Sequence, residues 1–162
     1  MSNDVADAAV VGSLTRSRRG IALLCGCGVY EDEHLSTLRA PRQDIASLTG
    51  ALGDPAVGNY DVRIAIDEPV HTVTNAIADV LQDCRRADIA LLYFSCHGVK
   101  DDHGRLYIAA RDTRLDRLRT SAVRASLLHE EMEDSRAQQI VVLLDCCFSG
   151  AFSREMAPRA GL

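Results

Sequence analysis

Residues 89–98 read IALLYFSCHG, and this stretch decides the fold class. Six apolar residues in a row, followed by a polar segment with a glycine, are typical of a strand buried on both faces of a sheet. The same pattern occurs at residues 21–25, IALLC, and at residues 140–150, IVVLLDCCFSG, while residues 62–66, VRIAI, alternate as a further strand. The sequence therefore predicts four strands.

Helix-forming segments separate these strands. Apolar residues recur at helical spacing from Ile45 to Leu52, where Gly53-Asp54-Pro55 stops the helix. Thr72 is placed to cap a second helix, and residues 125–134 form a third. The apolar face of the second helix consists of Val73, Ile77, Val80 and Leu81.

A turn at residues 101–104 leads into a return strand at residues 106–108. Buried strands that alternate with helices imply a sheet covered by helices on both faces. The predicted fold class is therefore α/β, with a mostly parallel sheet flanked by helices on both faces.

The composition indicates an ordinary globular domain. The chain has 162 residues, of which 47% are hydrophobic and 25% charged, and its formal net charge of -5 argues against nucleic acid or an anionic membrane as a partner. No apolar run approaches the roughly 18 residues of a membrane-spanning helix, and the acidic N-terminus lacks the pattern of a secretory signal. We therefore expect a cytoplasmic protein with neither of these partners.

The six cysteines give no sign of a metal site. Cys25 and Cys27, like the adjacent Cys146 and Cys147, are too close together for the two to four intervening residues of a structural zinc site. We expect reduced thiols, with Cys25, Cys27 and Cys84 as small buried hydrophobic residues. We assign no chemistry to four of the five histidines, which are His34, His71, His103 and His129.

Two other kinds of binding site are disfavoured. The segment Gly26-Cys27-Gly28 lacks the third glycine of the dinucleotide fingerprint, and the chain has no Gly-Lys-Ser/Thr phosphate loop. The run of arginines at residues 111–119 is more typical of a solvated loop than of a binding patch in an acidic chain, although it could also be a cleavage loop.

The candidate reactive residues of the chain are His97 and Cys147, which we expect at the ends of two of the predicted strands. Ligands of open parallel sheets bind beyond the carboxyl ends of the strands, so the two side chains are expected to converge there. A thiol attacks as a thiolate, and a neighbouring imidazole can take its proton and later protonate a leaving amine. The pair therefore predicts nucleophilic catalysis by cysteine.

Two motifs, Phe94-Ser95-Cys96-His97-Gly98 and Leu144-Asp145-Cys146-Cys147-Phe148-Ser149-Gly150, resemble the paired catalytic motifs of caspase-like cysteine peptidases. The closer similarity is to metacaspases and bacterial caspase-like proteins. The separation of fifty residues between His97 and Cys147 is close to that in caspases. The resemblance implies a caspase-hemoglobinase-like domain at residues 20–152, followed by a tail at residues 153–162 that resembles an inter-portion linker. Residues 1–19 have no stable hydrophobic period, and we expect them to form a mobile leader.

The resemblance assigns a role to each matching position. It implies Cys147 as the nucleophile, His97 as its acid/base partner, and the backbone amides of Gly98 and Cys147 as the oxyanion hole. It also implies a primary specificity pocket made of Asp44, Ser95 and Asp145. Two carboxylates in that pocket favour a basic residue over an acidic one, so we expect cleavage after Arg or Lys.

The chain departs from the family pattern at two cysteines. Cys96 replaces a glycine before the histidine, and Cys146 replaces a serine before the nucleophile. Adjacent side chains of a strand point to opposite faces, so only one of Cys146 and Cys147 can meet His97. The motif position favours Cys147, and the reverse assignment stays open.

Caspase-like domains normally continue into a smaller second portion, whereas this chain stops twelve residues after Gly150. We expect either a separate small portion or self-association through an exposed strand edge, besides a protein or peptide substrate. Truncation also leaves open the alternative of a non-catalytic caspase-like interaction or scaffold module. Self-processing after Arg154 or Arg159 is a further hypothesis.

No cofactor is expected to be required. Calcium is possible as an activator because some metacaspases respond to it. Asp101 and Asp102 alone fall short of the six to eight oxygen ligands of a calcium site.

Overall fold

A computed structural model describes residues 18–148 of the chain, the last two of them as backbone. Within these residues the elements follow in the order β1 (Gly20–Gly26), α1 (Ala40–Gly53), β2 (Tyr60–Ile66), α2 (Val70–Asp83), β3 (Ile89–Lys100), β4 (Leu106–Ile108), the 3-10 helix η1 (Leu115–Arg117), α3 (Leu118–Ser121), β5 (Val123–Arg124), α4 (Ala125–Asp134) and β6 (Gln139–Phe148). The predicted leader at residues 1–19 falls almost entirely outside the described residues, and the tail at residues 153–162 does so completely.

The four predicted strands form the parallel part of one sheet. Their order is β2-β1-β3-β6, and every neighbouring pair is parallel. The short strand β4 pairs antiparallel with residues 98–100 of β3, and β5 pairs antiparallel with β4. The sheet is therefore mixed, and the expected parallel arrangement holds for its four longest strands only.

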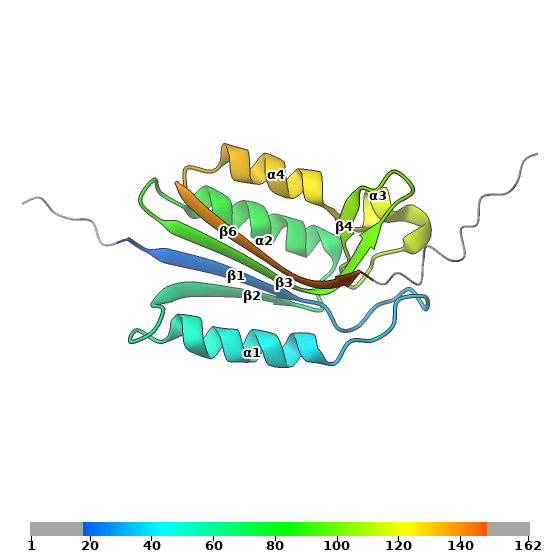
Figure 1. The fold of residues 1–162 in the computed structure, drawn as a ribbon, viewed down its shortest axis with the longest axis horizontal. Helices are drawn as coiled ribbons and strands as arrows, with labels where there is room; N and C mark the ends of the chain where they lie inside the picture. Colours follow the sequence, from blue (N-terminus) through cyan, green and yellow to red (C-terminus); the bar gives the residue numbers. More distant parts are fainter. Residues whose placement is uncertain (1–17, 149–162) are drawn as a thin grey trace, which may run out of the picture.

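Helices cover both faces of this sheet, as predicted (Figure 1). On one face α1 contributes Ile45, which is buried against Ala22 and Leu24 of β1. On the opposite face lie α2 and α4, whose buried apolar side chains form the larger core with β1 and β3. The helical members of that core are Val73, Ile77, Val80, Leu81 and Leu128.

Strand alternation decides which side chains of β3 meet which helix. Phe94 and Cys96 belong to the core under α2 and α4. Tyr93 belongs to the core under α1. The positions that follow it at a spacing of two, Ser95 and His97, therefore lie on the α1 face.

The two strands that carry His97 and Cys147 are both longer than predicted. β3 continues to Lys100, so His97 lies inside a strand and not beyond its end. The reason is that β4 supplies hydrogen-bond partners for residues 98–100. β6 continues to Phe148 because it stays paired with β3 as far as Gly98.

The prediction that Thr72 caps the second helix is wrong. The helix begins at Val70, directly after Pro69, and Thr72 lies inside its first turn. The amide of Val70 instead donates a hydrogen bond to Asp112 Oδ1 at 2.7 Å. A carboxylate 42 residues away in the sequence thus satisfies an amide at the start of this helix.

The arginine-rich segment is not a simple loop, because it forms the short helices η1 and α3. Arg111 forms an ion pair with Glu31, at 3.3 Å, and donates to the carbonyl of Asp67. Arg114 and Arg117 both pair with Asp116, at 3.6 and 3.8 Å. Three of the four arginines in the run therefore have acidic partners, as solvated surface arginines often do.

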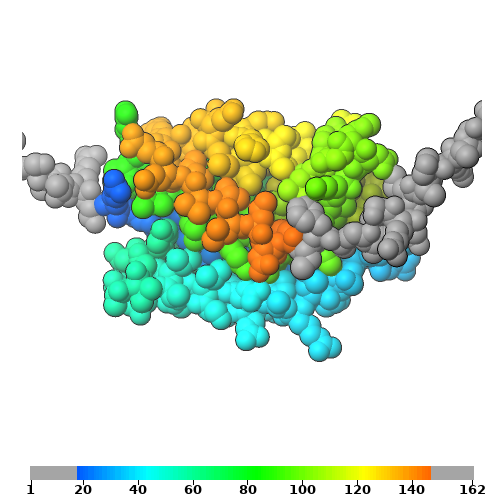
Figure 2. Space-filling model, in the orientation of Figure 1, coloured from blue at the N-terminus to red at the C-terminus, as the bar shows by residue number. Residues whose placement is uncertain are grey.

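β6 forms an edge of the parallel part of the sheet, since β3 is its only strand partner among the described residues. The space-filling view shows its residues at the surface (Figure 2). Val141, Leu143 and Leu144 are 42–46% exposed, so the prediction that this strand is buried on both faces is wrong: β6 has a strand neighbour on one side only among the described residues. In residues 18–148 we find no helix with the length and apolar character needed to cross a membrane.

Candidate active site

His97 lies near the carboxyl end of β3 and is held from two sides. Its side chain is buried, and its Nε2 lies 2.8 Å from the carbonyl oxygen of Ser36. Its backbone amide donates to the hydroxyl of Tyr30 at 3.1 Å, and that hydroxyl donates to the carbonyl of Cys27 at 2.7 Å. The ring centroids of Tyr30 and His97 are 5.0 Å apart. These contacts fix both the backbone and the ring of the histidine.

The contact with Ser36 determines which ring nitrogen carries the proton. A carbonyl oxygen only accepts, so Nε2 must be the protonated nitrogen in the neutral ring. Nδ1 is then the nitrogen with a free lone pair. It is buried and has no hydrogen-bond partner among the described residues. Nδ1 of the neutral imidazole can therefore act as a base, because its lone pair is not engaged in a hydrogen bond with any described residue.

Cys147 lies directly beside His97 in the sheet. The parallel register of β3 and β6 pairs Ser95 with Asp145, Cys96 with Cys146 and His97 with Cys147. Neighbouring strands lie about 4.8 Å apart. The structure thus brings the two predicted catalytic positions together by backbone pairing.

Cys146 lies on the other face of the sheet, in contact with Cys96. The two sulfur atoms are 3.4 Å apart, and both residues pack into the core under α2 and α4. The hydrogen bond to Cys146 and burial raise the pKa of the Cys96 thiol. Cys96 consequently does not crowd the face that carries His97, and Cys146 does not reach it.

The three residues of the predicted specificity pocket also come together. Ser95 Oγ donates to Asp44 Oδ2 at 3.3 Å, which joins β3 to the first turns of α1. The hydroxyl of Tyr93 donates to Asp145 Oδ2 at 3.1 Å. Burial, together with the nearby carboxylates of Asp145 and Asp44, raises the pKa of Tyr93. Two carboxylates and two hydroxyls therefore lie on the α1 face, beside the His97–Cys147 pair.

The predicted oxyanion donor Gly98 pairs with Ile108 of β4 and with Phe148 of β6. It thus lies at the point where the parallel and antiparallel parts of the sheet meet. The role of its amide stays a prediction.

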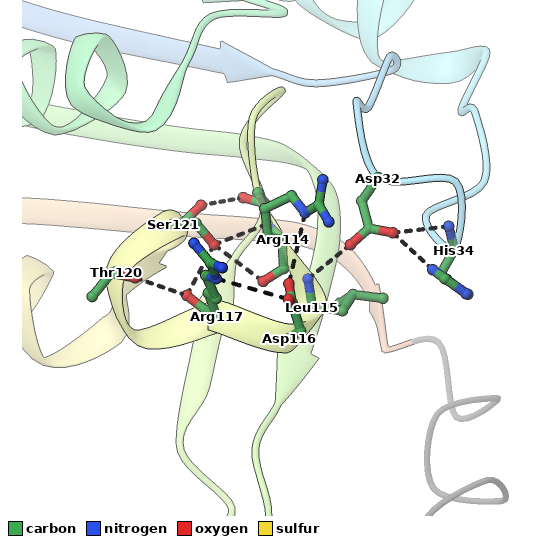
Figure 3. Close-up of polar contacts among 9 residues, drawn as sticks. Asp32, His34, Arg114, Leu115, Asp116, Arg117, Thr120 and Ser121 are labelled. Carbon is green, nitrogen blue, oxygen red and sulfur yellow. Dashed lines mark hydrogen bonds and ion pairs between the residues drawn. The ribbon is translucent and has the colours of Figure 1, made fainter.

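Sequence reasoning missed the residues that position Ser36. Asp32 Oδ1 accepts hydrogen bonds from the amide and Nδ1 of His34, at 3.0 and 2.9 Å, and Asp32 Oδ2 accepts one from the amide of Leu115, at 2.9 Å (Figure 3). Burial by itself would raise the pKa of Asp32, but the hydrogen bonds from Leu115 and His34 lower it overall. Leu35 packs against Val99 in a small separate core. The loop that carries Ser36 is thereby fixed to η1 and β3.

Asp67 fixes the other end of this loop. Its Oδ1 accepts hydrogen bonds from the amides of Gly28 and Val29, at 2.7 and 3.1 Å, and its Oδ2 forms an ion pair with Arg42 at 2.6 Å. Asp67 itself has a positive φ of 52° directly after β2. Neither Asp32 nor Asp67 belongs to a recognisable motif, so no sequence signal could have identified them.

The remaining cysteines are buried, as predicted. Cys25, Cys27 and Cys84 are free and at most 5% exposed. Burial raises the pKa of Cys25 to about 12 and that of Cys27 to about 11. Thiols that stay protonated at neutral pH behave as small hydrophobic groups and not as nucleophiles.

The geometry at the turn after β3 does not fit a calcium site. Asp101 accepts hydrogen bonds from the amides of His103 and Arg105, from Arg105 Nε and from the hydroxyl of Tyr107. These bonds lower the pKa of Asp101 to about 2 despite its opposing desolvation. No group of three or more Asp, Glu, His or Cys residues suited to a metal ion occurs in the described part of the chain. A role for calcium stays a prediction.

Comparison with known proteins agrees with this fold. No curated protein matches the chain. The family model of the caspase domain, in the C14 group of peptidases, matches residues 19–161 and therefore covers both strands of the candidate site. This confirms the resemblance drawn from the two motifs, and the chain belongs to the caspase-domain family of cysteine peptidases.

Proposed function

We propose that the protein is a cysteine endopeptidase in which Cys147 is the nucleophile and His97 the acid/base partner. The observation that carries the proposal is the pairing of the two positions in adjacent strands, together with the buried and unpartnered Nδ1 of His97. Position 147 also falls, by strand alternation, on the face of Asp145. Cys146 is engaged with Cys96 on the opposite face.

In the proposed reaction, Nδ1 of His97 takes the proton of the Cys147 thiol. The carbonyl of Ser36 accepts a hydrogen bond from Nε2 and so stabilises the imidazolium that forms. The thiolate attacks the peptide carbonyl, and the oxyanion is held by the amides of Gly98 and Cys147. His97 then protonates the departing amine, and water hydrolyses the thioester to regenerate the thiol.

We further propose cleavage after Arg or Lys. Asp44 and Asp145 contribute two carboxylates beside the catalytic pair, and no lysine or arginine forms an ion pair with either of them in the described part of the chain. A cationic substrate side chain would supply the missing countercharge, whereas an acidic one would be repelled. Ser95, which is buried, keeps Asp44 in place.

A reducing compartment, such as the cytoplasm, suits this chemistry. A cysteine nucleophile must stay reduced to act. The five cysteines whose side chains are described are free thiols, and Cys96 and Cys146 remain unbridged although their sulfurs are in contact.

The test is hydrolysis of fluorogenic peptides that differ only in the residue before the scissile bond. We expect turnover after Arg and Lys, with much lower turnover after Asp, and a loss of at least about 10³-fold in Cys147→Ala. Cys146→Ala is the matched control, because it removes an adjacent thiol on the other face. Full activity in Cys147→Ala, or better turnover after Asp, would contradict the proposal, and no turnover of any peptide would favour a non-catalytic interaction module.

A further inference from the structure

A cavity of about 340 Å³ lies between β4, α3, β5 and the first two turns of α4. None of the residues that we assign to catalysis or to the specificity pocket lines it. Its polar lining is strongly basic and includes Arg105, Arg119, Arg124, Ser126 and His129, while Leu106 and Tyr107 contribute an apolar wall.

The basic charge in this cavity is not neutralised by the protein. Arg119 and Arg124 make no ion pair or side-chain hydrogen bond with any residue in the described range. The side chain of Arg105 forms an ion pair with Asp101, but this pair uses only its Nε. By contrast, Arg114, which directly precedes the neighbouring helix η1, and Arg117, its last residue, are both paired with Asp116. The cavity therefore gathers unpaired cations in a chain whose net charge is -5.

Several positive charges that line a concave surface raise the local concentration of anions. Guanidinium groups match phosphate oxygens particularly well, because each offers parallel N–H donors in a rigid plane. Ser126 adds a hydroxyl donor at the same cavity. A volume of about 340 Å³ is at the lower end of the range, about 300–1,000 Å³, in which small-molecule sites occur.

We propose that this cavity binds a small phosphorylated molecule with at least two negative charges. Arg119 and Arg124 would hold the phosphate oxygens, and Arg105 would close one side. The apolar surface of Leu106 and Tyr107 would contact the remainder of the ligand. The proposal is independent of the peptidase activity, since it uses no residue of the candidate active site.

The experiment is a calorimetric titration of the full chain with inorganic pyrophosphate at constant ionic strength. The test variant is the double substitution Arg119→Gln and Arg124→Gln. The matched control is Arg114→Gln and Arg117→Gln, which removes the same charge from the adjacent segment, outside the cavity. All four side chains are exposed, so both variants are expected to keep the thermal stability of the wild type.

We expect saturable binding of pyrophosphate, weakened at least about tenfold in the test variant and less than about twofold in the control. The single substitutions Arg119→Gln and Arg124→Gln, each with a partial loss, provide the same test if the double variant does not fold. Equal losses in test and control variants would show general attraction by surface charge and overturn the proposal. The proposal is also wrong if the wild type shows no binding at pyrophosphate concentrations up to about 5 mM, which are sufficient to detect a Kd of about 1 mM. Equally strong binding of citrate would contradict it as well.

Discussion

Replacing Asp32 with asparagine is expected to destabilise the fold next to the candidate catalytic histidine. Asp32 uses one carboxylate oxygen for the two His34 donors and the other for the amide of Leu115. Asparagine keeps only one acceptor oxygen, so its amide nitrogen must face one of these N–H groups. At least one backbone amide donor thereby loses its partner.

The expected magnitude follows from burial. The Asp32 side chain is 7% exposed, so water does not readily replace the lost acceptor. A buried donor without a partner costs about 1–3 kcal/mol. We therefore expect Asp32→Asn to lower the free energy of unfolding by about 2 kcal/mol at pH 7, and Tm by about 4–8 °C.

The effect should depend on pH, because the pKa of Asp32 is lower in the folded than in the unfolded chain. A carboxyl group of this kind stabilises the fold above its unfolded pKa, about 3.9, and the stabilisation is lost as pH falls through the lower folded value. The stability difference between wild type and Asp32→Asn is thus full at pH 7 and narrows in acid.

Urea denaturation at pH 7 and in acid measures this difference. Asp116→Asn serves as the control, since Asp116 lies in the same region (Figure 3) but its side chain is 62% exposed, and its carboxylate forms ion pairs with the side chains of Arg114 and Arg117. We also expect kcat/KM of Asp32→Asn to fall several-fold, because the loop with Ser36 loses an anchor. An unchanged urea midpoint at pH 7 in Asp32→Asn would refute the reasoning.

Three further predictions concern the site and the core. Tyr30→Phe removes the hydroxyl that bonds the amide of His97, so kcat/KM should fall while KM changes little; a change in KM alone in steady-state assays would contradict this. Asp145→Asn should reduce the preference for Arg over a neutral residue about fivefold, since Asp145 is exposed and its charge is screened, and equal selectivity would argue against its place in the pocket. Ile77→Ala should lower the free energy of unfolding by about 2–5 kcal/mol, because Ile77 is fully buried in the larger core, and a loss below 1 kcal/mol in urea denaturation would not fit that packing.

The main strands were predictable because burial on both faces leaves a strong signal. The runs at residues 21–25 and 89–94 have no polar alternation, as expected of strands inside a helix-covered sheet. The run at residues 140–144 has the same pattern and forms a strand of that sheet, but at its edge, where Val141, Leu143 and Leu144 are partly exposed. The pairing of His97 with Cys147 then follows once the two strands are neighbours in register. Motif and topology together were thus sufficient to locate the candidate site.

The supporting residues were not predictable, because their roles depend on contacts between segments far apart in the sequence. Asp32 bonds Leu115, and Asp112 holds the start of α2 in place of Thr72. The acceptor for His97 is the main-chain carbonyl of Ser36, which any residue type could supply. The short helices η1 and α3 have too few residues for a period to emerge.

The central claim is that Cys147 is activated by His97, and alkylation followed by peptide mass analysis tests it most directly. With limiting iodoacetamide at neutral pH, we predict that Cys147 of the wild type is modified far faster than the other five cysteines. The rate should drop toward theirs in His97→Ala. Preferential modification of Cys146, or a rate at Cys147 that does not change in His97→Ala, would contradict the claim.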